Sequence, residues 1–335
     1  MRLNQMIELM QGKLHNAPAI DAFSGISFAL NALKKGDLFF AKNIQEIDAA
    51  IAMGAYGIVY DQSVLINDVE IAWIEVKNIE EAISRLLRYF LLSKKIEAFC
   101  LKDLEFAIFK QICTDANVLI YDENLEEIVS LLFCEENLYK AILFSQKKPL
   151  QYILDSTPSI VPQESLLDIR VATLFDLRFY YKFLHYHINL PVLFAQDLCA
   201  VLYLCENYQI QYDLSALKEL AAIKPNFIDS TPRLVDYGKS NKVLIAQEEL
   251  QDFKKYLKYI ALNGKWGRIM TFLPKDCAEE LPFPALFYGD KEDLYSFFQQ
   301  ENFHFGLVFG IKNEDLTHLL QSHAPKIMAS LFDEF

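Results

Sequence analysis

Residues 33–60, LKKGDLFFAKNIQEIDAAIAMGAYGIVY, predict a strand, a helix and a second strand in succession. Residues 34–37 predict a turn, because glycine tolerates positive φ and aspartate hydrogen-bonds nearby backbone groups. The apolar run that follows, residues 38–41, has the length of a buried strand. Apolar residues then recur at helical spacing, at Ile44, Ile47, Ile51 and Ala55. Gly54 marks the end of this helix, and residues 57–61 predict the next strand.

The composition is that of a globular protein with more than one domain. The chain has 335 residues, of which 53% are hydrophobic and 23% charged, which excludes a disordered protein. Its formal net charge of −13 argues against a nucleic-acid partner, since phosphate binding needs clustered Lys and Arg. Residues 1–14 lack the pattern of a signal peptide, and no window reaches the ~20 apolar residues of a membrane span. We therefore expect a cytoplasmic protein without a membrane span.

Cysteine and histidine give no metal-site pattern. The six cysteines form no CxxC pair and lie mostly in apolar runs, so we expect reduced, buried thiols. They are Cys100, Cys113, Cys134, Cys199, Cys205 and Cys277. His185 and His187 share one segment but have no third ligand at suitable spacing, which favours surface or hydrogen-bonded histidines.

A further strand and helix complete the N-terminal pattern. Residues 70–76 predict a strand, Asn78 a helix N-cap, and an apolar stripe the helix itself, at Ile83, Leu86, Leu87 and Phe90. Together with residues 33–60, this order resembles the first domain of the Mur ligase family, which reads pGDLFvAl, a helix, a GA pair and a strand. The resemblance covers residues 1–92 and is closest to the MurF type, which joins D-Ala-D-Ala to the UDP-MurNAc-tripeptide.

The resemblance implies an α/β fold in three parts. These are a small N-terminal α/β domain (1–92), a central, mostly parallel, doubly wound sheet (93–278) and a reduced C-terminal α/β unit (279–335). The residues agree, since strands and helices alternate after residue 95 in the way that predicts a parallel sheet covered on both faces. The tail predicts a short α/β unit without the family's KGSR-type motif.

The position of the family's phosphate-binding loop departs from the family pattern. In Mur ligases the first strand of the central domain runs into a glycine-rich loop ending in GK[ST]. Here the strand over residues 96–101 leads into Lys102, and no glycine occurs between Gly57 and Gly238. Lys102 is the local counterpart of the loop lysine, without a Ser or Thr partner for Mg²⁺. We therefore expect neither of the family's cofactors, ATP and Mg²⁺, to bind.

Two later segments depart from the family in the same way. Residues 190–200 keep the Leu-Pro and the apolar helix of the family's lpG.hn..NalaA segment, but not its Gly, His and Asn. Residues 242–249 stand where the family reads liDDsYNANP, and lack its aspartates, Tyr, Asn and Pro. Arg233 lies in a turn similar to the family's p..gR. It is the one polar position that the resemblance carries over from the family, as a candidate for binding the nucleotide cofactor.

The resemblance also marks candidate substrate-binding residues. The family's DSR turn, which contacts the uridine-muramoyl moiety, falls on residues 29–31 and makes Asn31 a candidate. The family's G...DG..f loop is shortened here to four residues, which makes Lys42 and Asn43 candidates. We hypothesise a family member without catalytic residues that binds a UDP-MurNAc-peptide or a peptidoglycan-synthesis protein.

Two alternatives stay open. The first is an active MurF-type ligase with a rewired site, or another activity on the same scaffold. Its candidate carboxylates are Asp122 and Glu123, which follow a central strand where open α/β sheets place ligands. Both residues also fit the N-terminal end of the next helix. The second alternative is a structural scaffold with no small ligand.

Overall fold

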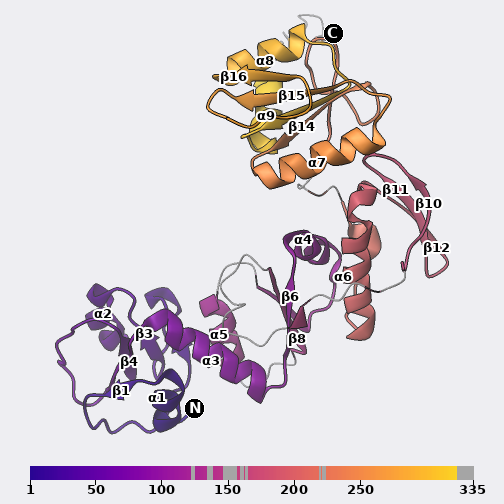
Figure 1. Cartoon of the computed structure of the whole chain (residues 1–335). Coiled ribbons are helices and arrows are strands. Elements are labelled where there is room, and N and C mark those ends of the chain that lie inside the picture. Colours follow the sequence, from indigo (N-terminus) through magenta and orange to yellow (C-terminus); the bar gives the residue numbers. More distant parts are fainter. Residues whose placement is uncertain are drawn as a thin grey trace, which may run out of the picture. The chain divides into compact units, whose positions relative to one another are not determined.

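The computed structural model describes residues 1–121, 125–133, 139–145, 157–158, 162, 165–218, 220 and 224–322. The chain divides into two compact units, each built from strands and helices (Figure 1). Unit 1 comprises Met1–Val161 and Ala200–Asp213, and unit 2 comprises Pro162–Cys199 and Leu214–Phe335. None of the described helices is long and apolar enough to cross a bilayer.

Five short strands form the first sheet of unit 1, in the order β1-β5-β4-β3-β2. They are β1 (Lys13–Leu14), β2 (Ile26–Ser27), β3 (Leu38–Phe40), β4 (Gly57–Tyr60) and β5 (Ala72–Glu75). All pair in parallel except β1, which is antiparallel to β5. The accompanying helices are α1 (Leu3–Met10), η1 (Leu30–Ala32), η2 (Ile44–Glu46), α2 (Ile47–Ala52) and α3 (Ile79–Ser93). The strands predicted over residues 38–41, 57–61 and 70–76 are confirmed.

Asp37 explains why the turn before β3 forms. Its side chain is buried, and Oδ2 accepts hydrogen bonds from Ser27 Oγ at 2.8 Å and the backbone N–H of Lys34 at 2.9 Å. Gly25 runs directly against this carboxylate, because a Cβ there would lie 2.3 Å from Asp37 Oδ1. Asp37, in the Gly36-Asp37 pair of the motif over residues 33–60, therefore holds β2 and the turn before β3 together through side-chain hydrogen bonds.

The second sheet of unit 1 is parallel, in the order β7-β8-β6-β9. Its strands are β6 (Glu97–Leu101), β7 (Val118–Tyr121), β8 (Ala141–Ser145) and β9 (Thr157–Pro158), with helices α4 (Asp103–Ile112) and α5 (Leu125–Phe133). Side chains of α3 and α5 share one buried cluster with strands of both sheets, for example Val59, Ile83, Val129 and Phe144. The two sheets of unit 1 are thus joined by one hydrophobic core.

A later stretch of chain completes unit 1. The second half of α6 (Ala195–Asn207) and residues 208–213 return to the second sheet. The ring of Tyr208 packs edge-on against Phe99 of β6, with centroids 4.4 Å apart. The backbones of Cys113 and Tyr212 form an isolated antiparallel β-bridge.

Asp115 binds this returning stretch to the second sheet, and we expect it to make the stability of unit 1 sensitive to acid. It accepts from the backbone N–H of Gln211 at 3.1 Å and pairs with Lys140 Nζ at 2.6 Å. Burial would raise the pKa of this carboxyl, but these contacts outweigh burial and lower it. A carboxyl with a lowered folded pKa stabilises the fold above its unfolded pKa of about 3.9, and this is lost as the pH falls through the folded pKa. Asp115→Asn should therefore destabilise unit 1 by about 1–3 kcal/mol at pH 7.

The denaturant midpoints of Asp115→Asn and the parent chain, followed from pH 7 to pH 3, test this expectation. The gap between the two midpoints should start to narrow below about pH 4, the pKa of the unfolded carboxyl, and should keep narrowing as the pH falls toward the lowered pKa of the folded carboxyl. A gap that stays constant with pH would show that the charge of Asp115 is not what stabilises the contact.

Unit 2 contains one antiparallel and one mostly parallel sheet. The strands β10 (Asp168–Ala172), β11 (Leu177–Tyr181) and β12 (Leu184–Ile188) form an antiparallel meander. The larger sheet has the order β13-β14-β17-β15-β16, with only β13 antiparallel. Its strands are β13 (Asn226–Ile228), β14 (Lys242–Gln247), β15 (Ile269–Pro274), β16 (Ala285–Tyr288) and β17 (Phe305–Phe309).

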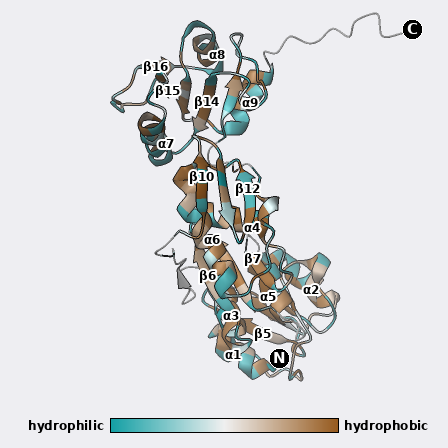
Figure 2. Cartoon of the chain, turned by 90° about the vertical axis from the view of Figure 1, so that its right-hand side faces the viewer, coloured by the Kyte–Doolittle hydropathy of each residue, from teal (hydrophilic) through white to brown (hydrophobic). Residues whose placement is uncertain are grey.

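Helices cover both faces of the larger sheet. α8 (Lys291–Gln300) and α9 (Asn313–Ser322) share a buried cluster with one face, which includes Leu244 and Phe272, and α7 (Leu250–Asn263) packs against β14 and β17 (Figure 1). The short helices η4 (Val192–Phe194) and η5 (Leu214–Ala216) complete the unit. β14 is hydrophobic and buried between its two polar end residues, whereas α9 carries hydrophilic residues on its outer side (Figure 2). This contrast is the pattern of a sheet buried on both faces.

The mixed α/β fold with parallel sheets agrees with the sequence, but the grouping of strands differs from it. The strands expected in one central sheet over 93–278 are divided between the second sheet of unit 1 and the two sheets of unit 2. β14 and β15 pair with β17, so strands on both sides of position 278 lie in one sheet. A short apolar run indicates a buried strand without indicating its partner, which is why the sequence did not resolve this grouping.

Candidate functional site

The start of α4 occupies the position where the family resemblance predicts a phosphate-binding loop. β6 ends at Leu101 and α4 begins at Asp103, so Lys102 alone connects strand and helix. A loop that wraps phosphates needs several successive backbone N–H groups that point inward, usually with glycines. A connection of one residue cannot supply such a cradle.

Glu105 fills the space at this helix start. Its side chain is fully buried, and its carboxylate accepts from the backbone N–H and from Nζ of Lys102, both at 3.0 Å. Asp103 also lies in the first turn and contacts the hydroxyl of Ser145 at the end of β8. Glu105 accepts from the N-cap N–H, and the negative charge of two carboxylates at a helix N-terminus repels a phosphate. Lys102 is therefore bound to the helix it precedes.

The candidate substrate residues follow the carboxyl ends of β2 and β3 in the first sheet. Asn31 lies exposed in η1 after β2, whereas Lys42 and Asn43 lie exposed after β3. Lys42 forms an ion pair with Glu126 of α5, and Asn43 Oδ1 accepts from the backbone N–H of Gln45 at 3.1 Å. The structure thus puts these residues at one edge of the sheet, where parallel strands commonly present ligand-binding groups. Asp122 and Glu123 lie outside the described residues.

Arg233 belongs to a tight turn in unit 2. Its backbone N–H donates to Asp229 Oδ1 at 3.1 Å, and its carbonyl accepts from the backbone N–H of Asp229 at 3.0 Å. Burial would raise the pKa of Asp229, but hydrogen bonds from Arg233 and Thr231 outweigh it and lower the pKa. The side chain of Arg233 is exposed, and the hydrogen bonds described above are made by its backbone.

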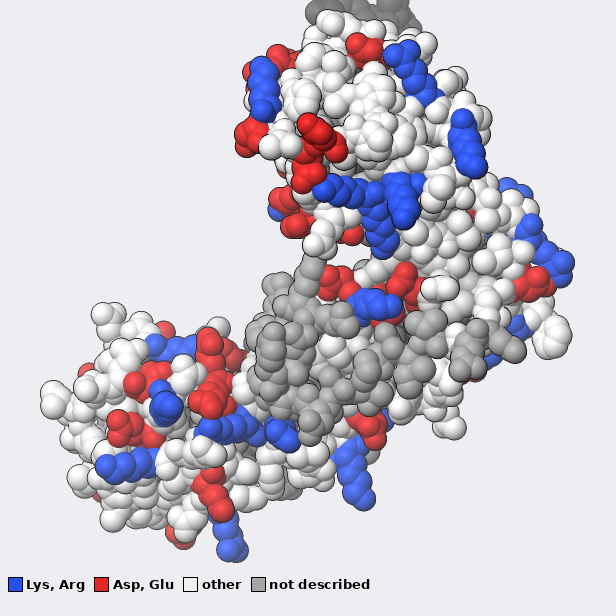
Figure 3. All heavy atoms as spheres, viewed as in Figure 1, with Lys and Arg blue, Asp and Glu red and all other residues white. Residues whose placement is uncertain are grey.

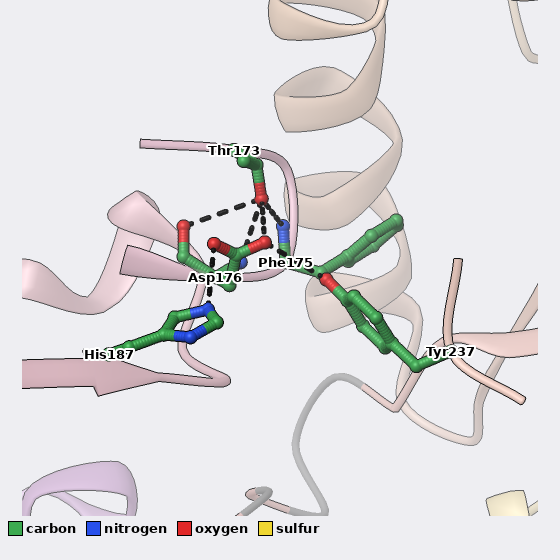
Figure 4. A network of polar contacts seen from close by, with 5 residues as sticks. All are labelled: Thr173, Phe175, Asp176, His187 and Tyr237. Carbon is green, nitrogen blue, oxygen red and sulfur yellow. Dashed lines mark hydrogen bonds and ion pairs between the residues drawn. The ribbon is translucent and has the colours of Figure 1, made fainter. Parts of the chain in front are cut away.

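The neighbouring histidines both lie on β12 but have different surroundings. His187 Nε2 lies 3.3 Å from Oδ1 of the buried Asp176, whose Oδ2 accepts from Thr173 Oγ1 and from Tyr237 OH (Figure 4). His185 packs beside Tyr180, with ring centroids 5.2 Å apart. Within the part of the chain that the structure describes, no three His, Cys, Asp or Glu side chains are grouped to hold a metal ion. The Asp176 network therefore links the β10–β11 turn to the loop before β14.

Acidic and basic side chains are mixed over the surface. Both signs are interspersed on the face of each unit that Figure 3 shows. Ion pairs of opposite charge include Lys254 with Glu279 and Lys291 with Asp315. Such pairs shorten the range of the local field, because each charge has a close counter-charge.

Sequence reasoning missed a cleft of about 470 Å³ in unit 2. It lies at the amino ends of β14 and β17, beside the C-terminal end of α7. Five aromatic residues line it: Phe175, Phe227, Tyr259, Trp266 and Phe305. Thr173, Ser240, Asn241 and Asn263 supply uncharged polar groups. Burial raises the pKa of Tyr259 to about 12, so its hydroxyl keeps its proton and donates to the Leu174 carbonyl at 3.2 Å.

One sequence signal could have drawn attention to this cleft. Residues 264–267 read GKWG, and both glycines lie close to Phe305: a Cβ at Gly267 would lie 2.4 Å from its Cε2, and one at Gly264 would lie 2.9 Å away. The two glycines let this turn approach β17 and leave Trp266 projecting between them, 67% exposed. The turn Gly-Lys-Trp-Gly directly after α7 is therefore the local sequence feature that accompanies this exposed ring.

Several solved structures resemble this chain over nearly its whole length. MurF from Acinetobacter baumannii matches with a TM-score of 0.55 and 10% sequence identity, over 96% of this chain and 98% of that one. The chain has the fold of a Mur ligase. A second A. baumannii structure, a UDP-N-acetylmuramoylalanyl-D-glutamyl-2,6-diaminopimelate–D-alanyl-D-alanyl ligase, matches with a TM-score of 0.52 and 11% identity, over 96% and 98% of the two chains.

The MurF ligase of Thermotoga maritima, solved in complex with ADP, matches over 89% of this chain and 96% of that one, with a TM-score of 0.50 and 10% identity. No protein-family model and no curated protein matches the sequence. At such low identity the Mur ligase similarity establishes the fold, and the chemistry has to be argued from the residues of this chain.

Proposed function

We propose that this chain is a non-catalytic Mur-ligase-like protein of the cytoplasm, which acts by binding in the synthesis of peptidoglycan precursors. The Mur ligase fold supports the link to that synthesis. The start of α4 supports the loss of catalysis, because a single residue, Lys102, replaces the phosphate-binding loop and the buried Glu105 takes up its space.

Ligation through an acyl phosphate needs a clamp for the triphosphate, a metal ion and a lysine to neutralise the transferred group. At the start of α4 the carboxylates of Asp103 and Glu105 have the wrong charge for a phosphate clamp. Lys102 Nζ is already bound by Glu105. We therefore infer that the chain binds neither ATP nor Mg²⁺ there.

The proposed ligand is a UDP-MurNAc-peptide, or else a protein partner from peptidoglycan synthesis. The edge of the first sheet that carries Asn31, Lys42 and Asn43 is the proposed contact for the precursor. Lys42 could meet a diphosphate once its ion pair with Glu126 opens, since both side chains are partly exposed. Asn31 and Asn43 add amide donors at the same edge.

Thermal unfolding with added ligands tests the proposal. A ligand that binds only the folded chain stabilises it by about 2.7 kcal/mol at 100 times its Kd. We expect no shift of Tm with ATP and Mg²⁺, and a rise with UDP-MurNAc-tripeptide that Lys42→Ala reduces. A rise with ATP and Mg²⁺ would favour an active, rewired ligase and overturn the proposal. No rise with any precursor, and no capture of a peptidoglycan-synthesis protein from the native cytoplasm, would leave the structural scaffold.

A further inference from the structure

We infer that the aromatic cleft of unit 2 is a binding site for an uncharged sugar ring. The inference is independent of the proposed function, because it concerns another unit and another edge of a sheet.

The cleft is built for a ligand without charge. Among the described residues that line it, none carries a charge. Asn263 is the last residue of α7, so the helix presents its C-terminal end to the cleft. The partial negative charge at a helix C-terminus disfavours phosphate and carboxylate groups. A nucleoside diphosphate or an acidic peptide would have no cation to meet among these lining side chains.

The arrangement of the rings favours a single stacked ligand face. Trp266 meets Phe305 at an interplanar angle of 63°, and Phe175 meets Phe227 at 81°, so these pairs are edge-to-face. Edge-to-face pairs do not form the two parallel walls that would hold a flat heteroaromatic ring between them. Trp266 instead offers an exposed ring, whose negative π-face attracts the C–H groups on one side of a pyranose.

The polar groups of the cleft match the rim of a sugar. Asn263 Nδ2 donates one hydrogen bond to the Tyr259 carbonyl at 2.8 Å, which fixes the orientation of its amide. The side chain of Asn241 makes no hydrogen bond within the described residues and is exposed at the cleft. A carboxamide both donates and accepts, which suits neighbouring hydroxyl groups that do the same. The volume of about 470 Å³ lies in the range of small-ligand sites.

Titration calorimetry of the full chain with glucose, galactose, mannose, N-acetylglucosamine and N-acetylgalactosamine tests the inference. We expect saturable binding of at least one of them, weakened roughly fivefold or more by Trp266→Ala through loss of the stacked ring. Asn241→Ala should also weaken binding. Phe287→Ala, which removes an exposed aromatic from β16 outside the cleft, is the matched control and should leave binding unchanged.

Uridine and UDP-N-acetylglucosamine complete the panel. Binding of uridine in preference to every sugar, or tighter binding of the charged UDP-sugar than of N-acetylglucosamine, would overturn the inference. The absence of saturable sugar binding would overturn it as well. So would sugar binding by Trp266→Ala and Asn241→Ala that is as tight as binding by the parent chain. Both variants alter exposed side chains, and circular dichroism confirms that each is folded. Because the cleft and the first sheet use different ligands and different residues, this inference and the proposed function can fail separately.

Discussion

Glu105→Ala is expected to destabilise unit 1 by about 2–4 kcal/mol, since it removes a fully buried carboxylate and leaves polar partners behind. The backbone N–H and Nζ of Lys102 would each lose the hydrogen bond to Glu105. Glu105→Gln should cost less, because the amide oxygen can still accept from that N–H. Neither variant should gain affinity for ATP, because the connection between β6 and α4 stays one residue long.

Urea unfolding followed by tryptophan fluorescence measures this effect in unit 1 alone if Trp266 of unit 2 is first replaced by Phe. The chain has two tryptophans, and Trp73 is buried in the first sheet of unit 1. Glu81→Ala is the matched control, because Glu81 is an exposed carboxylate in the first turn of α3 that pairs with Arg85 at 2.6 Å. Such exposed helix pairs contribute about 0.3–0.5 kcal/mol. If Glu105→Ala costs no more than Glu81→Ala, Glu105 is not the structural substitute for the loop.

Asp37→Ala is the second large effect, with an expected loss of about 2–3 kcal/mol in the stability of unit 1. The buried carboxylate ties Ser27 of β2 to the backbone N–H of Lys34, and its removal leaves both groups without this acceptor. Asp37→Asn should fall between Asp37→Ala and the parent chain, because its amide oxygen can replace only one carboxylate oxygen.

The same Trp73 signal reports this loss, since Trp73 lies in the sheet that Asp37 anchors. Asp48→Ala serves as the control: Asp48 is an exposed acidic residue in the first turn of α2, where it contributes about 0.3–1 kcal/mol through the helix dipole. Equal unfolding midpoints for Asp37→Ala and Asp48→Ala would contradict the role of Asp37 in holding β2 to the turn before β3.

The local pattern of the opening motif was readable from sequence because each of its signals is local. Gly54 has φ of +94°, as a helix-ending glycine should, and Asn78 accepts from the backbone N–H of Glu81 as an N-cap. The helix predicted from Ile44 begins instead as the short η2 and continues as α2 from Ile47. The first turn of a helix is often 3₁₀, and sequence spacing does not distinguish the two.

Features that depend on distant parts of the chain were not readable. Glu105 reads as an ordinary acidic residue near a helix start, and nothing local indicates that it is fully buried. The aromatic cleft draws on six separate stretches of chain, from the β10–β11 turn to β17, so no single motif contains it. The missing glycines were visible in the sequence, whereas the one-residue connection at Lys102 became visible only with both element boundaries.

The discontinuity of unit 1 has a consequence for synthesis on the ribosome. Residues 200–213 belong to unit 1 although they follow a long excursion into unit 2, and Gln211 supplies the N–H that Asp115 accepts. A nascent chain that has emerged only to residue 161 therefore lacks part of its own first unit. Completion of that unit must wait until the ribosome has released the excursion and the fourteen residues after it, so translation speed through residues 162–199 sets how long the incomplete unit stays exposed.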